Sequence, residues 1–276
     1  MLTHLTNTTK SIVFYAIALA LALIAARQPG ITPIVYMFTP LAATALMLFV
    51  VTRDGYTRAG WATLGLHRLG LRGWGYAPLV PLLAFSGAYG VAWSAGIAPF
   101  AWGEHTPLQL IIETVVEIVI ATLTASLGEE LGWRGYLLPQ LESLGPRRAM
   151  LLTGLAQTVW HFPMIFLTTL YHPEGNRLIV IPLFFASVMI IEGFFIGYLR
   201  LATGSVWPAS IAHSAHNALV AMFGGLTIAS GPLVAEYLLG ESGILTLAGY
   251  ALVLGGVAYL VTKHPRAARP PAVQRI

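Results

Sequence analysis

Long apolar stretches separated by short polar ones dominate the pattern along this chain. A membrane-crossing helix needs about 20 apolar residues, because it rises about 1.5 Å per residue through a hydrocarbon core of about 30 Å. The pattern therefore predicts an all-α, polytopic membrane helix bundle with about eight transmembrane helices. Eight stretches could serve as spans: 11–26, 32–51, 77–102, 108–138, 149–170, 178–199, 207–226 and 244–261.

The composition indicates one transmembrane domain over residues 1–276. Hydrophobic residues make up 57% of the chain and charged residues 9%, against about 25% charged residues in soluble domains. Too few polar residues remain to cover a second, soluble domain. The absence of cysteine excludes disulfides, thiolate nucleophiles and thiolate metal ligands, so any chemistry must use carboxylate, imidazole, amide or hydroxyl groups.

The basic residues are unevenly divided between the two ends of the expected bundle. Eight crossings put both termini on one side, and twelve of the fifteen Lys and Arg residues lie in the tails and loops of that side. Because basic loops stay in the cytoplasm, we expect a multi-pass protein of the plasma membrane with both termini cytoplasmic, ending in a basic tail at 263–276. The same distribution accounts for the net charge of +4 without a nucleic-acid partner.

The polar segment 52–76, between the second and third spans, mixes arginines with tryptophan and leucine. This mixture is typical of an amphipathic element that lies at anionic headgroups, so we expect membrane lipids as partners there. A plain solvated loop is the alternative.

A small set of polar residues interrupts the apolar spans. Each costs several kcal/mol at membrane depth, so such residues mark a functional site or a tight internal pairing. Counted by helix rise from the side of the termini, Glu129 lies roughly 13 Å deep, His161 roughly 18 Å and Asn217 roughly 15 Å. Three helices should thus bring polar groups together in the cytoplasmic half of the membrane. The full set is Glu113, Glu117, Glu129, Glu130, Arg134, Gln157, His161, Glu192, His213, His216 and Asn217.

The helical period separates the two adjacent carboxylates at 129 and 130. Glu130 and Arg134 are four residues apart and share a face, as do His213 and Asn217. We therefore expect Glu130 to pair with Arg134 in a supporting role, and Glu129 to remain free to act as a general base.

These groups suffice for amide hydrolysis without a covalent intermediate. A water molecule held between Glu129 and His161 would be the nucleophile, and His213 with Asn217 could hydrogen-bond the oxyanion that forms on the attacked carbonyl. Glu129, His161 and His213 could alternatively hold a zinc ion that activates the water. The helical His-Glu-x-x-His signature of many zinc peptidases is absent.

Two motifs resemble those of a known protease family. Residues 129–134 read Glu-Glu-Leu-Gly-Trp-Arg and match a Glu-Glu-x-x-x-Arg motif, and residues 213–217 read His-Ser-Ala-His-Asn and match His-x-x-x-Asn. Both are similar to motifs of the CAAX-protease and bacteriocin-processing (CPBP) family, also called the Abi or type II CAAX prenyl endopeptidase family. The similarity covers about residues 118–219, and we expect the catalytic core at about 108–226.

The resemblance implies a glutamate-dependent peptidase whose site lies inside the bilayer, open to the cytoplasm. Its substrate would be a peptide or protein, including lipidated or membrane-embedded ones. Carried over by motif position, the resemblance implies the same catalytic and supporting roles that we inferred from the faces that these residues share on their helices. One motif departs, because the family has Phe-x-x-x-His where this chain has Gln157 four residues before His161.

Two other functions fit the same polar residues. Buried carboxylates and imidazoles also build the proton relays of transporters, and Glu113 and Glu117 near the far end of the fourth span would extend such a path. However, the chain has no pair of broken helices in matching halves, which transporters commonly have. The other alternative is a scaffold that binds a peptide in the membrane without cleaving it.

Overall fold

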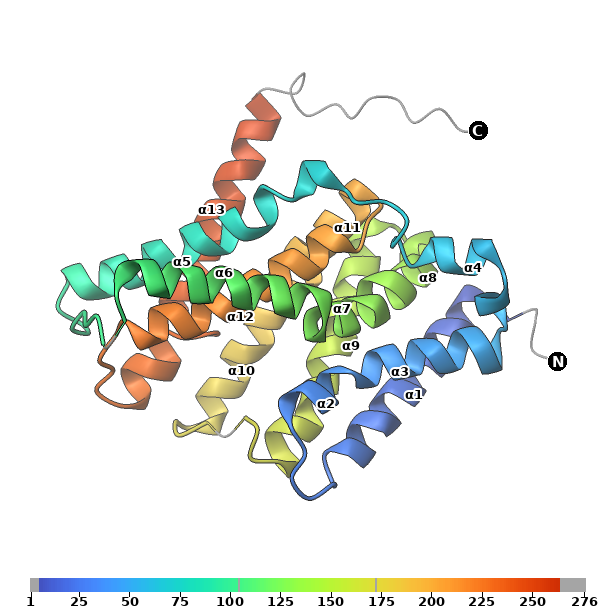
Figure 1. Ribbon diagram of the computed structural model, residues 1–276, viewed down its shortest axis with the longest axis horizontal. Helices are drawn as coiled ribbons and strands as arrows, with labels where there is room; N and C mark the ends of the chain where they lie inside the picture. The colour runs from blue at the N-terminus through green and yellow to red at the C-terminus, as the bar shows by residue number, and fades with distance from the viewer. Residues whose placement is uncertain (1–4, 104, 172, 264–276) are drawn as a thin grey trace.

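The computed structural model is a bundle of helices, as the apolar pattern predicts (Figure 1). It describes residues 5–103, 105–171 and 173–263, so most of the expected basic tail lies outside the described residues. These ranges contain no β-strand, only an isolated bridge between Phe100 and Thr227.

The helices follow one another along the chain with short connections, and η denotes a 3-10 or π-helix. The elements are α1 (Asn7–Ala25), α2 (Pro33–Met37), α3 (Thr39–Leu46), η1 (Met47–Val51), η2 (Asp54–Tyr56), α4 (Arg58–Thr63), η3 (Leu71–Gly73), α5 (Tyr76–Ser94), α6 (Pro107–Leu123), α7 (Ala125–Glu130), η4 (Leu131–Leu137), α8 (Leu138–Leu141), η5 (Glu142–Leu144), α9 (Pro146–Leu167), α10 (Arg177–Ser187), η6 (Val188–Ile196), α11 (Gly197–Thr203), α12 (Trp207–Gly225), η7 (Leu233–Leu238) and α13 (Ile244–Lys263).

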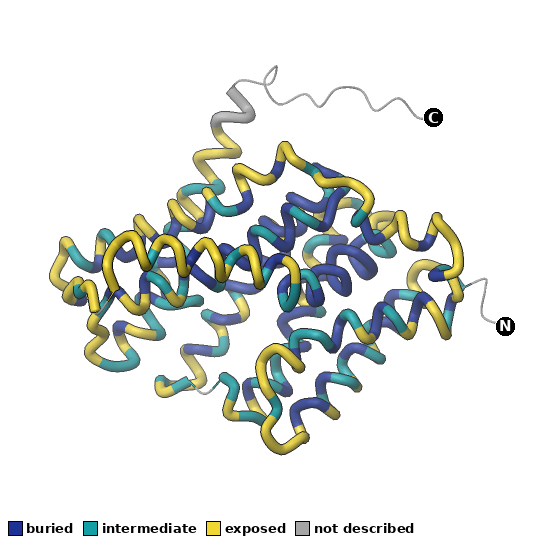
Figure 2. Tube along the Cα trace, viewed as in Figure 1, coloured by how far each residue is buried: buried dark blue, intermediate teal, exposed yellow. Residues whose placement is uncertain are grey.

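Six of the expected spans are long and apolar enough to cross a membrane within the described residues. They are Asn7–Ala25, Pro33–Val51, Leu71–Ser94, Pro107–Leu144, Pro146–Leu167 and Arg177–Thr203. The seventh, α12, has 19 residues but carries two histidines and an asparagine that lower its hydropathy. Helix α6 presents many apolar side chains to the outside, as lipid contact requires, whereas the central helices are largely buried (Figure 2).

The order of the crossings defines two ends of the bundle. The N-terminal face holds the start of α1, the segment between η1 and α5, and the junctions before α9 and α12. The distal face holds the loops that follow α1, α5, α9 and α12. In Figure 1, α4 and α8 lie toward the right of the view at the N-terminal face, and the loop after α1 lies at the bottom.

The segment 54–74, here called the cap segment, folds over the N-terminal face. Its carbonyl groups accept hydrogen bonds from residues that flank the junction between α11 and α12: Arg200 Nη2 donates to Thr63 O (2.8 Å), and Trp207 Nε1 donates to Leu66 O (3.1 Å). Exposed aromatic side chains such as Tyr56 and Trp61 stand on it. The cap segment is thus a set of short helices docked on the bundle, and its contact with lipid headgroups stays a prediction.

The fourth span is not one regular helix. Thr124 leaves the helical conformation (φ −128°, ψ −99°), so α6 ends there and α7 begins a new turn that carries Glu129 and Glu130. The chain continues as a π-helix, η4, and a second π-helix, η6, carries Glu192. Such wide turns occur frequently at functional sites because they redirect side chains.

Two glycines allow α9 and η6 to cross with their backbones in contact. A Cβ atom added at Gly154 would lie 2.8 Å from Gly193 Cα, and one added at Gly193 would lie 3.3 Å from Gly154 Cα. Small residues permit this close approach of membrane helices. The crossing lies one turn from Gln157 and beside Glu192, and it brings these two side chains into the same pocket.

Candidate active site

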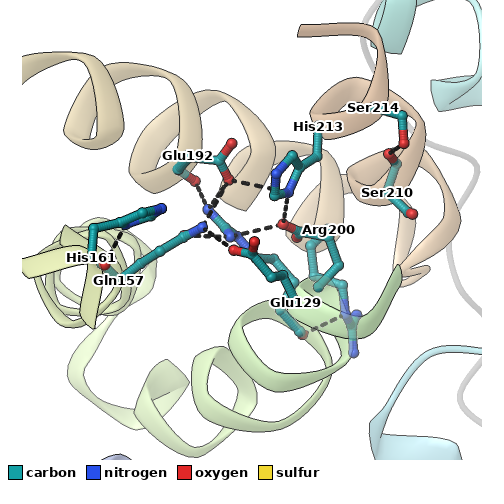
Figure 3. Close-up of polar contacts among 10 residues, drawn as sticks. Glu129, Gln157, His161, Glu192, Arg200, Ser210, His213 and Ser214 are labelled. Atoms are coloured by element: carbon teal, nitrogen blue, oxygen red, sulfur yellow. Dashed lines mark hydrogen bonds and ion pairs between the residues drawn. The ribbon is translucent and has the colours of Figure 1, made fainter. Parts of the chain in front are cut away.

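A cavity of about 260 Å³ lies among α2, α7, α9, η6 and α12. Aromatic and aliphatic side chains, including Tyr36, Trp160 and Phe184, form much of its wall. The polar residues that line it are Glu129, Gln157, His161, Glu192, His213, Asn217 and Glu241. The four residues that the sequence predicts as catalytic therefore border one common cavity, and Figure 3 shows three of them, Glu129, His161 and His213, around Gln157 and Glu192.

The two adjacent glutamates differ in their partners, as the helical period predicts. Glu130 Oε1 lies 3.0 Å from Arg134 Nη1, and both side chains are fully buried. Glu129 lines the cavity and forms no ion pair among the described residues; its carboxylate accepts one hydrogen bond, from Gln157 Nε2 at 3.3 Å. The expected pairing of Glu130 with Arg134 is confirmed, and Glu129 is the carboxylate left facing the cavity.

Arg134 is bound from three sides inside the bundle. Besides Glu130, its Nη1 donates to Gln157 Oε1 (2.7 Å), and its Nη2 lies 3.2 Å from Glu192 Oε2 and also donates to the Glu192 carbonyl oxygen. A guanidinium has five N–H donors in a rigid fork and can serve these four acceptors together, whereas an ammonium group has only three donors. Arg134 thereby ties α7, α9 and η6 together beneath the cavity.

Gln157 links the charged residues of the site. Its Oε1 accepts from Arg134, and its Nε2 donates to Glu129 Oε2 (3.3 Å) and to Glu192 Oε2 (3.4 Å). The sequence marks this position as a polar residue within a span and as a departure from an aromatic residue in the family motif. The structure assigns it a definite role, because an amide can donate to two carboxylates and accept from a guanidinium at once.

Replacing Gln157 by leucine should lower the free energy of unfolding by about 1–3 kcal/mol, because buried groups on Arg134 and Glu129 then lose a partner. Thermal unfolding of the purified protein in detergent measures this change. Thr158→Val is the matched control: Thr158 is equally buried, but its hydroxyl bonds only Gly154 O of its own helix (2.8 Å), so a smaller loss is expected. Equal losses in both variants would contradict the linking role of Gln157.

His161 is held in a fixed orientation at the cavity wall. Its Nδ1 lies 2.8 Å from Gln157 O, and since a carbonyl oxygen only accepts, Nδ1 is the protonated nitrogen and donates. Trp160 and Phe184 contact the ring edge to face, at centroid distances of 4.7 and 5.2 Å. Nε2 is therefore left as the nitrogen that can accept a hydrogen bond from a molecule in the cavity.

His213 and Asn217 stand one turn apart on α12 and both line the cavity. His213 Nδ1 lies 3.0 Å from Glu130 Oε1 and 3.9 Å from Glu192 Oε2. The contact with the Glu130 carboxylate makes Nδ1 a donor and leaves Nε2 for the cavity. Asn217 is partly exposed and forms no side-chain hydrogen bond within the described part of the chain, so its amide is available to a bound molecule.

The three residues expected to hold zinc do not form a ligand group in this structure. Among the described residues, the carboxylate and imidazole atoms that lie within 4.8 Å of one another belong to Glu130, Glu192 and His213, not to Glu129, His161 and His213. The assembled group does not fit a divalent ion, because the Arg134 guanidinium already lies 3.0 and 3.2 Å from its two carboxylates. The positive charge at this position is supplied by the protein.

Three other polar residues of the spans lie away from the cavity. His216 Nδ1 is hydrogen-bonded to the Tyr250 hydroxyl (2.8 Å), and its ring packs against Phe85, so it joins α12 to its neighbours. Glu113 and Glu117 are exposed on α6, and Glu113 contacts His105 at 3.3 Å. These positions give no support to a relay running from the cavity through α6.

Glu241 borders the cavity although sequence reasoning did not select it. It lies in the loop before α13, where no helical period or motif marks it, and only the tertiary fold brings it beside the other residues. Removal from bulk water, and then the nearby charge of Glu192, raise the pKa of the Glu241 carboxyl to about 7, against the smaller opposing effect of His213.

The cavity extends toward the distal face of the bundle. Pro33, Tyr171 and Glu241 lie in or next to the distal loops and line it, whereas no lining residue comes from the cap segment. The depth estimate places the site in the half of the membrane near the termini, and the resemblance implies that it opens on that side; the residues that line the cavity lead toward the distal face instead. Helix rise gives the depth of a residue but does not reveal that the cap segment covers the N-terminal face.

Together these features define a class: a polytopic α-helical membrane protein with a polar cavity, lined by carboxylates and imidazoles, within its helices. Residues 111–219 match the profile of the family described as type II CAAX prenyl endopeptidase Rce1-like. The chain thus carries an Rce1-like domain, which confirms the resemblance that the two motifs indicate. This domain contains every residue predicted to be catalytic and ends before Glu241.

A local match to a second protein supports the same resemblance. The chain is 40% identical over 60 residues to CAAX prenyl protease 2 of Methanococcus maripaludis. The aligned stretch covers 21% of this chain and 22% of that protein, so the likeness is local.

Proposed function

We propose that this protein is an intramembrane endopeptidase that hydrolyses a peptide bond with a water molecule activated by Glu129. The observation that carries the proposal is the unequal pairing of the carboxylates at the cavity. Glu130 and Glu192 contact Arg134, whereas Glu129 faces the cavity without an ion pair in the described structure. A carboxylate that is not neutralised by a fixed cation can accept and return a proton.

In the proposed reaction, Glu129 takes a proton from water as the water oxygen attacks the carbonyl carbon of the peptide bond. His161 Nε2 accepts a hydrogen bond from the water and helps to hold it. His213 acts as an imidazolium, with Nδ1 donating to Glu130, so its Nε2–H and the Asn217 amide can donate to the resulting oxyanion. The carbon–nitrogen bond then breaks, and Glu129 passes the proton to the departing amine. Glu130 and Arg134 keep these groups in place. No step requires a metal ion.

The substrate is a peptide or protein that reaches the cavity from the distal face. We propose a plasma-membrane location with cytoplasmic termini, supported by the twelve basic residues on the side of the termini. Because the cavity runs toward the distal face, this orientation admits the substrate from outside the cell. It replaces the cytoplasmic access that the sequence predicted.

Single cysteines report this access directly, because the natural chain contains none. With a small, membrane-impermeant thiol reagent, we expect Arg177→Cys at the distal face to be labelled in intact cells. Arg147→Cys at the other face should be labelled only after permeabilisation, and Met164→Cys in the cavity should behave as Arg177→Cys does. If Met164→Cys were labelled only after permeabilisation, as Arg147→Cys is, distal access would be contradicted. If all three variants showed the opposite labelling pattern, cytoplasmic termini would be contradicted.

Mass spectrometry of cleavage products tests the proposed activity. The wild-type protein, purified in detergent, is incubated with a peptide library and with membrane extracts in water enriched in oxygen-18. We expect new carboxyl termini that each carry one heavy oxygen from the solvent, and no peptidyl hydroxamate when hydroxylamine is added, because no acyl-enzyme forms. The double variant Glu129→Gln/His161→Ala, prepared identically, provides the blank.

Two results would reject the proposal or its mechanism. Identical product profiles for the wild type and the blank would end the peptidase assignment. Loss of activity with a zinc chelator, restored by added zinc, would contradict the metal-free reaction, since the guanidinium of Arg134 occupies the one group of close ligands in the described structure.

A further inference from the structure

Glu241 differs from the other acidic residues of the cavity in having no partner. Glu192 contacts Arg134 at 3.2 Å, and Glu129 accepts a hydrogen bond from Gln157 at 3.3 Å. No side-chain hydrogen bond or ion pair involves the Glu241 carboxylate in the described part of the chain, although the residue lines the same cavity. Partly exposed and without a partner, the Glu241 carboxylate is available to a ligand of opposite charge.

The turn that carries Glu241 is fixed to its surroundings. Gly240 has a left-handed backbone (φ 69°), its N–H donates to the Tyr89 hydroxyl (3.1 Å), and its carbonyl accepts from Thr246 Oγ1 (2.9 Å). Ser187 Oγ donates to the carbonyl of Glu241 itself (3.0 Å). Three helices thus hold the backbone at residues 240 and 241, and the side chain borders the cavity from a rigid support.

The loops around this end of the cavity are joined to one another. The Glu236 carboxylate accepts hydrogen bonds from the N–H groups of Glu174 (2.7 Å) and Gly175 (3.1 Å), which connects η7 to the loop after α9. Tyr171 of that loop lines the cavity together with Glu241. Glu241 therefore lies at the distal end of the cavity, between the distal face and Glu129, and hydrogen bonds join the loops around it.

The wall of the cavity carries several carboxylates. Three carboxylates line it, and no lysine or arginine does within the described residues. Of these three, only Glu241 is both free of protein partners and separate from the residues assigned to the reaction. A cationic group entering from the distal face would meet Glu241 before it reached Glu129.

We propose that Glu241 is a specificity-determining residue that binds a positively charged group of the substrate, an amine or guanidinium close to the cleaved bond. This inference rests on the proposed peptidase function. It assigns the substrate class as cationic peptides and gives a binding role to a residue outside the Rce1-like domain. Binding of such a group forms a shielded ion pair at the cavity wall, so a substrate that lacks the charge leaves the carboxylate unpaired.

Matched peptides measure this preference. A sequence cleaved in the library experiment is synthesised with lysine, norleucine or glutamate at each position within three residues of the cleaved bond, with and without an acetylated amino terminus. For the wild type we expect kcat/KM about 10-fold higher with a positive charge than with norleucine, chiefly through KM. If acetylation removes the preference, the charge comes from the terminal amine; if lysine replacement removes it, the charge comes from the side chain.

The variants separate a binding role from a structural one. Glu241→Gln should abolish the preference with little change in kcat for the norleucine peptide, and Glu241→Lys should shift the preference to glutamate. Glu174→Gln, which removes a carboxylate from the same face outside the cavity, should behave as the wild type. Cleavage without a charge preference, or an unchanged preference in Glu241→Gln, overturns this inference and leaves the peptidase proposal standing; failure of the wild type to cleave any peptide overturns both.

Discussion

Replacing Glu129 by glutamine should reduce kcat for peptide cleavage by about 10²- to 10⁴-fold, the usual contribution of a general base, while the protein stays folded. Glutamine has the same shape but cannot take a proton from water. Folding should persist because Glu129 makes no ion pair among the described residues and accepts a single hydrogen bond, from Gln157. Initial rates with a cleaved peptide, together with the thermal unfolding temperature in detergent, measure the two effects separately.

The adjacent carboxylate provides the matched control. Glu130→Gln removes the same charge one residue away, but Glu130 contacts both Arg134 and His213 at 3.0 Å. We therefore expect this variant to lose stability as well as activity. Wild-type kinetics in Glu129→Gln would refute the assigned base, and an equal loss of stability in both variants would refute the distinction between the two glutamates.

Replacing Arg134 by methionine should lower the free energy of unfolding by about 3–5 kcal/mol, the usual cost of leaving a buried charge without its partner. Glu130 and Glu192 would then face one another with only His213 between them. Arg134→Lys keeps the charge but cannot reach the same acceptors together, so an intermediate loss is expected. The yield of monodisperse protein and its thermal unfolding in detergent measure the effect.

A second substitution tests the cause of this loss. Adding Glu130→Gln to Arg134→Met removes one of the stranded carboxylates, so the double variant should be more stable than Arg134→Met alone. Arg147→Met, at an exposed position, should change stability by no more than about 0.5 kcal/mol. Strictly additive losses in the double variant would show that the buried ion pair is not responsible.

The sequence predicted the ion pair within one helix better than the hydrogen bonds between helices. The spacing of Glu130 and Arg134 is a property of one helical turn, and their ion pair follows from it directly. Gln157 could not be understood in that way, because its partners come from α7, η4 and η6. When a residue differs from the one in the family motif, the sequence shows the difference, but the role of the new residue is known only from its neighbours.

The irregular parts of the fold were even harder to predict from the sequence. The break at Thr124 has no glycine or proline to announce it, and the π-turns of η4 and η6 depart from the 100° period on which facing arguments depend. Glu241 is an isolated acid in a loop, and its approach to the cavity depends on contacts with Tyr89, Ser187 and Thr246 from three other elements. The side from which the cavity is reached depends in turn on where the cap segment folds.

The contact between Gly154 and Gly193 also determines how the protein can respond to the thickness of its membrane. Helices adapt to a thinner or thicker bilayer mainly by changing their tilt. Because α9 and η6 touch through their backbones at this point, a change in tilt becomes a rotation about the glycine pair. Gln157 and Glu192, close to the pivot, would keep their separation, while the outer ends of the same helices would move apart or together. Lipid composition could therefore alter the width of the substrate entrance and leave the polar centre intact.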